Sequence, residues 1–339
     1  MHHATASDLL RALQPRAALL DAGHSGRAIA AAVAGRELHR VRRGWYVARE
    51  EWDALWSEAR HLAHVLAVNE DAAGTRPVFA LASAAVLHGL PLYRVQPRRV
   101  HLIGAPGARR SIDDVYRHEA DLDPDDVVEV DGMRCTSLAR TVHDLARLAS
   151  PEVAIAALDA AVGRIGGDPR RFDDDAAEAW RAELHGRARP RMRGIRRATA
   201  LLDIADGRAQ LPLEAVTTLQ LWRLGFARPQ LQVPVPGPNG RVFWMDIEIP
   251  GVGFYECDGL GKYVEPAMLA GRTSGQVVLD EKSREDWVRG VTGRRVLRGG
   301  SADSISSAAL AARLRSFGVV LPPHRPHPFL PNLPVAHGL

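Results

Sequence analysis

The stretch FYECDGLGK, residues 254–262, places two acidic residues between an apolar run and a glycine-rich segment. Glu256 and Asp258 are two positions apart, so their side chains would lie on the same face of a β-strand. A third acid, Asp246, lies in the preceding apolar stretch VFWMDIEI, residues 242–249. Neighbouring strands are about 4.8 Å apart, and the three carboxylates could therefore converge. The cluster is either a metal site for phosphodiester chemistry or a solvated, charged hairpin.

The surrounding sequence predicts a helix, three strands, a helix and a strand, in that order. The first helix is PLEAVTTLQLWRLG, residues 212–225, which opens with a proline and closes with a glycine. The predicted strands are 231–235, 241–249 and 254–258, followed by a helix over 276–292, a strand over 294–298 and a last helix over 301–318. This α-β-β-β-α-β order is the core order of the PD-(D/E)xK nuclease superfamily.

Phosphodiester hydrolysis at such a site requires divalent cations held by carboxylates, close to a group that activates water. We expect Asp246, Glu256 and Asp258 to bind Mg²⁺ or Mn²⁺. Glu214, in the first turn of the first helix, would complete the catalytic set, or it is an acid that simply favours the helix start. Lys262 follows the third strand and could fold back to polarise the attacking water.

Five pieces of this region resemble, in order, a family related to the very-short-patch repair endonucleases. The matching residues are Leu213-Glu214, Asp246 with Pro250, Glu256 to Gly259 with Lys262-Tyr263, EKSRED at 281–286 and GRRVLR at 293–298. The resemblance implies a Mg²⁺-dependent endodeoxyribonuclease. Asp258, however, occupies the position where the superfamily motif has lysine, and Lys262, Lys282 or Arg284 would have to replace that charge. The alternative is a nuclease-shaped module without catalysis.

The first 50 residues predict a winged helix-turn-helix. Ser7, Pro15 and Ser25 are suited to helix starts, and a basic hairpin follows at 37–47. The helix over 25–34 would enter the major groove of double-stranded DNA, and the hairpin would lie over phosphates. The residues expected to contact DNA are Arg27, Arg36, Arg40, Arg42 and Arg43. Alternatively, the domain mediates protein contacts and its arginines are solvated.

Three stretches resemble the AbiEi-type antitoxins of abortive-infection toxin–antitoxin systems. They are GRELHRVRRGWYV at 35–47, FALASAAVLHGLPL at 79–92 and TSLARTVHDLAR at 136–147. This resemblance implies a non-enzymatic antitoxin that represses its own operon and binds a cognate toxin protein. Winged-helix proteins often bind palindromes as dimers, so a homodimer is a further expectation.

The expected architecture is α+β and multidomain. It has a winged helix over 1–50, an antitoxin-like α/β middle domain over 51–200, a PD-(D/E)xK-like domain over 201–320 and a tail over 321–339. In the middle domain, we expect helices over 52–67 and 77–92 and a hairpin around Asp131-Gly132. The segment RARPRMRGIRRATALLDIA at 187–205 predicts a basic helix, which is either a solvated face or a phosphate contact. The histidines at 88, 101, 118 and 143 match no metal-ligand spacing.

Composition indicates an ordinary globular protein of the cytoplasm. The formal charge is +4, from 44 Lys and Arg against 40 Asp and Glu, which is too small an excess to imply nucleic acid by itself. The two cysteines, Cys135 and Cys257, lie in expected strands and fit free buried thiols in a reducing compartment. No apolar signal core and no apolar run of about 20 residues is present in the sequence.

Overall fold

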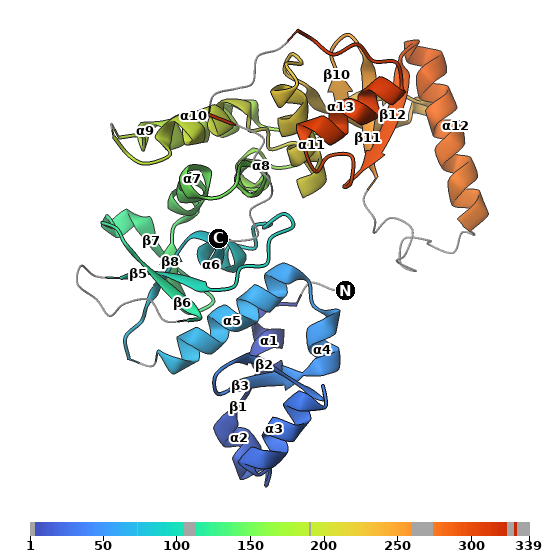
Figure 1. Cartoon of the computed structure of the whole chain (residues 1–339). Coiled ribbons are helices and arrows are strands. Elements are labelled where there is room, and N and C mark those ends of the chain that lie inside the picture. The colour runs from blue at the N-terminus through green and yellow to red at the C-terminus, as the bar shows by residue number, and fades with distance from the viewer. Residues whose placement is uncertain are drawn as a thin grey trace. The chain divides into compact units, whose positions relative to one another are not determined.

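The computed structural model describes residues 4–72, 74–104, 113–189, 191–258, 274–323 and 329–330. As expected from the sequence, the protein is of the α+β class. The described residues form helices and three separate sheets. Its contacts group into two compact units, divided between Leu145 and Ala146 (Figure 1). Each unit is described by itself. No helix in the described part of the chain is both long and apolar enough to cross a membrane.

The first unit begins with three short helices and a small sheet (Figure 1). The helices are α1 (Ala6–Ala12), α2 (Arg16–Asp21) and α3 (Gly26–Ala34), and the strands β1 (Gln14–Pro15), β2 (Leu38–Arg42) and β3 (Trp45–Ala48) form a sheet in the order β1-β3-β2. Ser25 caps α3 as predicted, by accepting from the Ala28 N–H. The prediction for α1 was wrong by two residues, because Thr5 and Asp8 form a capping box there.

The rest of the first unit contains a five-stranded sheet with helices. The elements are α4 (Arg49–Ala54), α5 (Ser57–Asp71), β4 (Val78–Phe79), α6 (Leu81–Leu87), β5 (Val100–Gly104), β6 (Val115–Glu119), η1 (Pro124–Asp126), β7 (Val127–Val130) and β8 (Met133–Thr136). The sheet order is β6-β5-β4-β8-β7. The predicted hairpin around Asp131-Gly132 is confirmed, and both residues have positive φ, 48° and 77°, as a tight two-residue turn requires.

The long helix expected after residue 51 is interrupted at Leu55 and Trp56, where the chain is extended between α4 and α5. The break buries Leu55 in the core, at 5% exposure. It also places Trp52 and the start of α5 beside each other: Arg60 donates to the carbonyl of Trp52 at 3.1 Å. The helix expected to begin at Pro77 likewise starts later, at Leu81, because Val78 and Phe79 pair with β5.

The second unit opens with a layer of helices. They are α8 (Pro151–Gly166), α9 (Asp174–Gly186), α10 (Ile195–Ile204) and α11 (Pro212–Arg223), and α7 (Leu138–Leu148) precedes them across the division. The basic helix predicted over 187–205 is confirmed only in its second half, since α10 begins at Ile195. Gly194, with φ 78°, lies so close to the Arg147 carbonyl that no side chain would fit. Arg197 binds the carbonyls of Ala146 and Arg147, at the end of α7.

A four-stranded sheet completes the second unit. Its strands are β9 (Gln230–Pro236), β10 (Val242–Ile249), β11 (Gly253–Asp258) and β12 (Arg295–Gly300), with η2 (Pro238–Gly240) between β9 and β10, and with α12 (Ser274–Thr292) and α13 (Ser307–Ser316). The order β12-β11-β10-β9 has one parallel pair, β11 with β12, whose connection contains α12. Val288 of α12 packs with Met245, Phe254 and Val296 of the sheet.

The elements from α11 to β12 occur in the order that the sequence predicts. The predicted domain boundaries at 50, 200 and 320 stay predictions. The helices α8, α9 and α10, which the sequence placed in the middle domain, lie in the second compact unit.

Candidate functional site: an acid cluster clamped by arginines

Glu256 and Asp258 both lie on β11, next to β12. In the parallel ladder Glu256 is paired with Arg298, and Asp258 with Gly300. Glu256 is buried, with 4% of its surface exposed, and its carboxylate is held by Arg284 of α12 at 3.2 and 3.5 Å. Arg284 also donates to the carbonyl of Trp244 on β10, at 2.6 Å. A charge-assisted contact of this kind stabilises the carboxylate while it fixes α12 over the sheet.

Arg298 is the second cation of this surface. Its guanidinium lies 3.5 Å from Asp258, 2.8 Å from Glu281 and 3.4 Å from Glu285. Burial works against the charge of Arg298, but the three carboxylates outweigh it and raise the pKa of this arginine. Asp258 therefore faces an arginine that is already shared with two acids of α12.

Asp246 binds the backbone of the neighbouring strand. The antiparallel pairing of β10 with β11 ends at Ile247 and Tyr255. Beyond that pair, the Asp246 carboxylate accepts the N–H of Cys257 at 2.9 Å. Asp246 thus replaces a main-chain acceptor where the ladder stops, and in this position it supports the strand that carries Glu256 and Asp258.

Glu214 is buried on α11, with 2% exposure. Its carboxylate accepts the N–H of Gln210 at 2.9 Å and faces the amide of Gln232 at 3.4 Å. Gln232 has the left-handed φ of 51° and is missing from the recorded pairs of β9 with β10. The irregular strand turns this amide towards the acid, so Glu214 is satisfied inside the unit.

The thiol of Cys257 lies among the predicted acids. Burial raises its pKa well above the usual range, and Asp246, Glu214 and Glu256 add to the effect while Thr217 opposes it. The N–H of Cys257 donates to Asp246 on β10, and its thiol donates to Thr217 on α11, one turn after Glu214, so Cys257 links the three elements that carry these acids. The fold brings the predicted residues into one neighbourhood around Cys257.

Asp246, Glu256 and Asp258 each have a partner within the protein, and the metal site expected there stays a prediction. Glu256 is bound by Arg284, Asp258 by Arg298, and Asp246 by the Cys257 N–H. Within the described ranges, no three His, Cys, Asp or Glu side chains are arranged to hold a metal ion. A cation such as Mg²⁺ prefers several free carboxylate oxygens, and these carboxylates already have partners. Lys262, the predicted water-activating residue, lies outside the described residues.

A basic pocket of about 750 Å³ lies elsewhere in the same unit, between the helical layer and β9–β10. Its arginines are Arg170, Arg171, Arg181, Arg208 and Arg228. Arg208 is paired with Asp174 and Asp206, whereas Arg170, Arg171 and Arg228 are exposed and have no ion pair to any described residue.

This pocket has an aromatic wall and a link to the acid cluster. The guanidinium of Arg170 lies 5.5 Å from the ring centre of Trp244. The carbonyl of Trp244 is the one that Arg284 binds while it holds Glu256. The basic pocket and the acid cluster are thus connected through one residue of β10.

The five arginines expected to contact DNA differ in their surroundings. Arg27, Arg36, Arg40 and Arg43 are exposed and have no ion pair within the described chain. Arg42 has a side chain only 11% exposed, bound to Asp71 at 3.0 Å and to Asp114 at 2.9 Å. The register of β2 shifts between Arg40 and Arg42, and a bulge of this kind re-aims a side chain. Strict alternation of side chains along β2 would put Arg40 and Arg42 on the same face of the strand. The bulge between them is the reason that this expectation fails.

Some residues of these surfaces were not foreseen as site residues. Arg298 entered only as part of a motif, and Arg170, Arg171 and Arg228 were not singled out. Arg298 meets Asp258 through the parallel pairing of β11 with β12, which no spacing in the sequence reveals. The signal that could have found it is the GRRVLR segment itself, since an arginine in a predicted apolar strand needs an acidic partner.

Comparison with known proteins gives a partial match only. No protein-family model matches the chain. The chain is similar to an uncharacterized protein of Mycobacterium tuberculosis strain H37Rv, with 34% identity over 121 residues. The same identity and length hold for the uncharacterized protein of strain CDC 1551. The match covers 36% of this chain and 41% of each relative, so the chain spans about two fifths of the length of these relatives.

Proposed function

We propose that this protein is a double-stranded-DNA-binding regulator whose first 50 residues act as a winged helix. The observation that carries the proposal is the set of four exposed arginines on α3, the following turn and the β2–β3 hairpin, none of which has an ion pair within the described chain. Charges left free in this way are available to phosphates, and helix α3 has the size and position of a major-groove helix.

The C-terminal domain, on this proposal, has a PD-(D/E)xK-like core that binds nucleic acid without cleaving it. Arg284 and Arg298 neutralise the acids that a nuclease would offer to metal ions. The exposed guanidinium groups of Arg170, Arg171 and Arg228 supply phosphate contacts instead. A cognate toxin, implied by the AbiEi-type resemblance, and a homodimer, expected of winged-helix proteins, remain part of this proposal.

DNA binding is tested by footprinting and gel shift on the region upstream of the gene. We expect Arg40→Ala with Arg43→Ala to weaken binding at least tenfold, because two phosphate contacts are lost. Arg76→Ala is the matched control, since it removes the same kind of charge from the same unit at a side chain that is 61% exposed. Equal affinity of the double variant and the control would refute the winged-helix assignment.

A metal-dependent endodeoxyribonuclease is the second candidate. It is favoured by one observation, that Cys257, next to Glu256 on β11, contacts both Asp246 on β10 and Thr217 on α11, the helix that carries Glu214. The discriminating experiment is plasmid nicking with Mg²⁺ or Mn²⁺. We expect the wild type and Asp246→Ala to give the same background. Nicking by the wild type that Asp246→Ala abolishes would establish the nuclease instead.

A further inference from the structure

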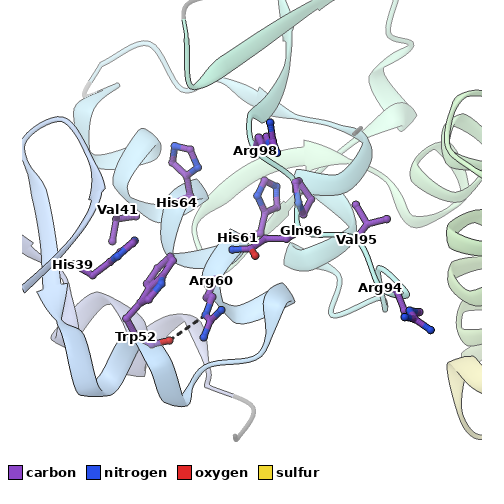
Figure 2. A pocket seen from close by; sticks show the side chains of 11 residues that line it. His39, Val41, Trp52, Arg60, His61, His64, Arg94, Val95, Gln96 and Arg98 are labelled. Carbon is purple, nitrogen blue, oxygen red and sulfur yellow. Dashed lines mark hydrogen bonds between the residues drawn. The ribbon is translucent and has the colours of Figure 1, made fainter. Parts of the chain in front are cut away.

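A second pocket, of about 560 Å³, lies in the first unit beside the basic hairpin (Figure 2). Its lining residues are His39, Val41, Trp52, Arg60, His61, His64 and the segment 94–98. Figure 2 shows the residues of β2 and α4 on one side of the space and those of 94–98 on the other, with α5 between them. The hairpin and two parts of the scaffold thus share one cavity.

In the part of the chain that the structure describes, the charged residues that line this pocket include arginines but no acid. No Asp or Glu is among the described lining residues, whereas Arg60 and Arg98 are. Arg98 is exposed and forms no ion pair with a described residue. Arg94 points away from the other side chains in Figure 2. The Asp53 carboxylate lies near Arg60 but does not line the pocket, so the guanidinium groups of the lining make it attractive to anions.

Arg60 is held in a fixed position. Its Nε donates to the Trp52 carbonyl and its Nη2 to the Asp53 carbonyl, each at 3.1 Å. The guanidinium also lies over the Trp52 ring, 5.6 Å from its centre. No hydrogen bond to another described residue involves its Nη1. A guanidinium that is fixed in this way loses little side-chain entropy when it binds an anion.

The remaining walls are flat or apolar. His39 stacks on Trp52 with ring centres 4.0 Å apart and planes 14° apart. Val95 and Pro97 are buried. His61 adds no charge, because burial, together with His64 and His101, keeps its pKa well below the usual range. His64 is 3.4 Å from Asp114. The pocket therefore offers cations for a charged group and apolar surface for an organic body.

We propose that this pocket binds a small phosphate ester, for which Arg60 and Arg98 supply positive charge and Val95 and Trp52 supply apolar surface. The guanidinium fork suits phosphate oxygens, and the volume lies within the range of small-molecule sites, roughly 300–1,000 Å³. This is a binding site distinct from the DNA-contacting arginines and from the acid cluster.

Occupancy of the pocket would affect the hairpin. His39 and Val41 line the pocket, and Arg40, between them on β2, is exposed. A ligand that contacts His39 and Val41 has different affinities for different positions of β2, which is the requirement for coupling between two sites. The ligand would thus change the affinity of the protein for DNA, an effect that rests on the proposed function.

Ligand binding is tested first, without DNA, by calorimetry and thermal shift on the full chain. The probes are AMP and inorganic phosphate, with chloride at matched ionic strength as reference. We expect AMP to bind and to raise the melting temperature. Arg98→Ala should weaken AMP binding about tenfold or more, since a charged hydrogen bond is lost. Arg60→Lys, which keeps the charge but loses the fork, should weaken it as well.

Arg99→Ala is the matched control, because Arg99 is equally exposed, adjacent in the sequence and absent from the lining. It should bind AMP like the wild type. Failure of AMP and phosphate to bind, or equal weakening by Arg98→Ala and Arg99→Ala, overturns the site. Binding of citrate in place of both phosphate probes overturns the assignment to phosphate esters.

The coupling is tested by the DNA affinity with and without saturating AMP. We expect a change of at least threefold in the wild type and none in Arg98→Ala. Unchanged affinity in the wild type, despite bound AMP, overturns the coupling. If the wild type binds AMP but no DNA, the proposed function fails while the ligand site stands.

Discussion

Both compact units bury ion pairs, among them Arg140 with Asp126 and Asp144 in the first, but the buried histidines of the described chain all lie in the first unit. The first unit buries neutral histidines: His61 is 3.0 Å from the Ser83 hydroxyl, and His101 is 2.8 Å from His118. The second unit buries ions in pairs, Arg223 with Glu152 and Glu256 with Arg284. A buried neutral histidine opposes protonation, whereas a buried ion depends on its partner. The first unit should therefore respond to acid, and each unit to the loss of one member of a buried pair.

The largest effect is expected for Arg223→Ala. Both members of this pair are buried, so the change leaves the Glu152 carboxylate without its cation. We expect a loss of roughly 3–5 kcal/mol in the free energy of unfolding, measured by urea denaturation. The double variant Arg223→Met, Glu152→Leu removes both charges and should recover most of this loss. A double variant as unstable as the single one would break the comparison.

Acid should destabilise the protein through the first unit. Burial, together with His118 and Arg99, lowers the pKa of His101 to about 4. The folded state therefore resists protonation that the unfolded state accepts near pH 6.5. The stabilising effect is complete above about pH 6.5 and is lost as the pH falls towards 4, with a total of about 3 kcal/mol. Urea denaturation at a series of pH values measures the slope.

The matched variants for this prediction are His101→Asn and His24→Asn. His101→Asn should flatten the pH dependence between pH 6.5 and 4, because the group that titrates is gone. His24 is exposed, so its replacement should leave the slope as in the wild type. The same slope in all three proteins would show that His101 is not responsible.

Arg42 and Arg40 lie on the same strand of the hairpin, but we expect them to have different roles. Arg42→Ala removes the contacts to Asp71 and Asp114, and we expect about 1–2 kcal/mol of lost stability. Arg40→Ala should leave stability within about 0.5 kcal/mol of the wild type but weaken DNA binding, because its charge has no partner in the described chain. Thermal unfolding and gel shift on both variants separate the two roles. Equal behaviour of the two variants would contradict the bulge-based assignment.

The smallest effect concerns the basic pocket of the second unit. Replacement of Arg170, Arg171 and Arg228 by alanine should reduce the slope of log K against log salt concentration for DNA by roughly 0.7–0.9 per lost phosphate contact. Arg315, exposed on α13 and absent from this pocket, provides the control. An unchanged slope would mean that these arginines do not contact phosphates.

Local signals predicted much of the fold. Ser25 marks the start of α3, Asp131-Gly132 marks a hairpin turn, and alternating apolar residues mark the strands around Asp246 and Glu256. These features depend on neighbours within a few residues, so the sequence contains them directly. The start of the helix predicted over 187–205 was misplaced because the fit of Gly194 against the Arg147 carbonyl is a contact between distant segments.

The sequence predicted which acidic residues form the candidate site, but not which groups those residues bind. The sequence identified Glu214, Asp246, Glu256 and Asp258 as one group, and three of them act on the Cys257 thiol. Their partners could not be predicted, because Arg284 reaches Glu256 from α12 and Arg298 reaches Asp258 through a parallel strand pairing. Whether an acid is free for a metal or bound to an arginine depends on those partners.

The sequence by itself determined the order of helices and strands, the alternation that places Glu256 and Asp258 together, and the basic character of the hairpin. These follow from local periodicity and from turn and cap residues. The tertiary structure decided which charges remain free. It binds Arg42 to carboxylates and leaves Arg40 exposed, clamps the acid cluster with Arg284 and Arg298, and forms the pocket of Arg60 and Arg98. The reason is physical: a charge is neutralised by groups within a few ångströms in space, however far apart they lie along the chain.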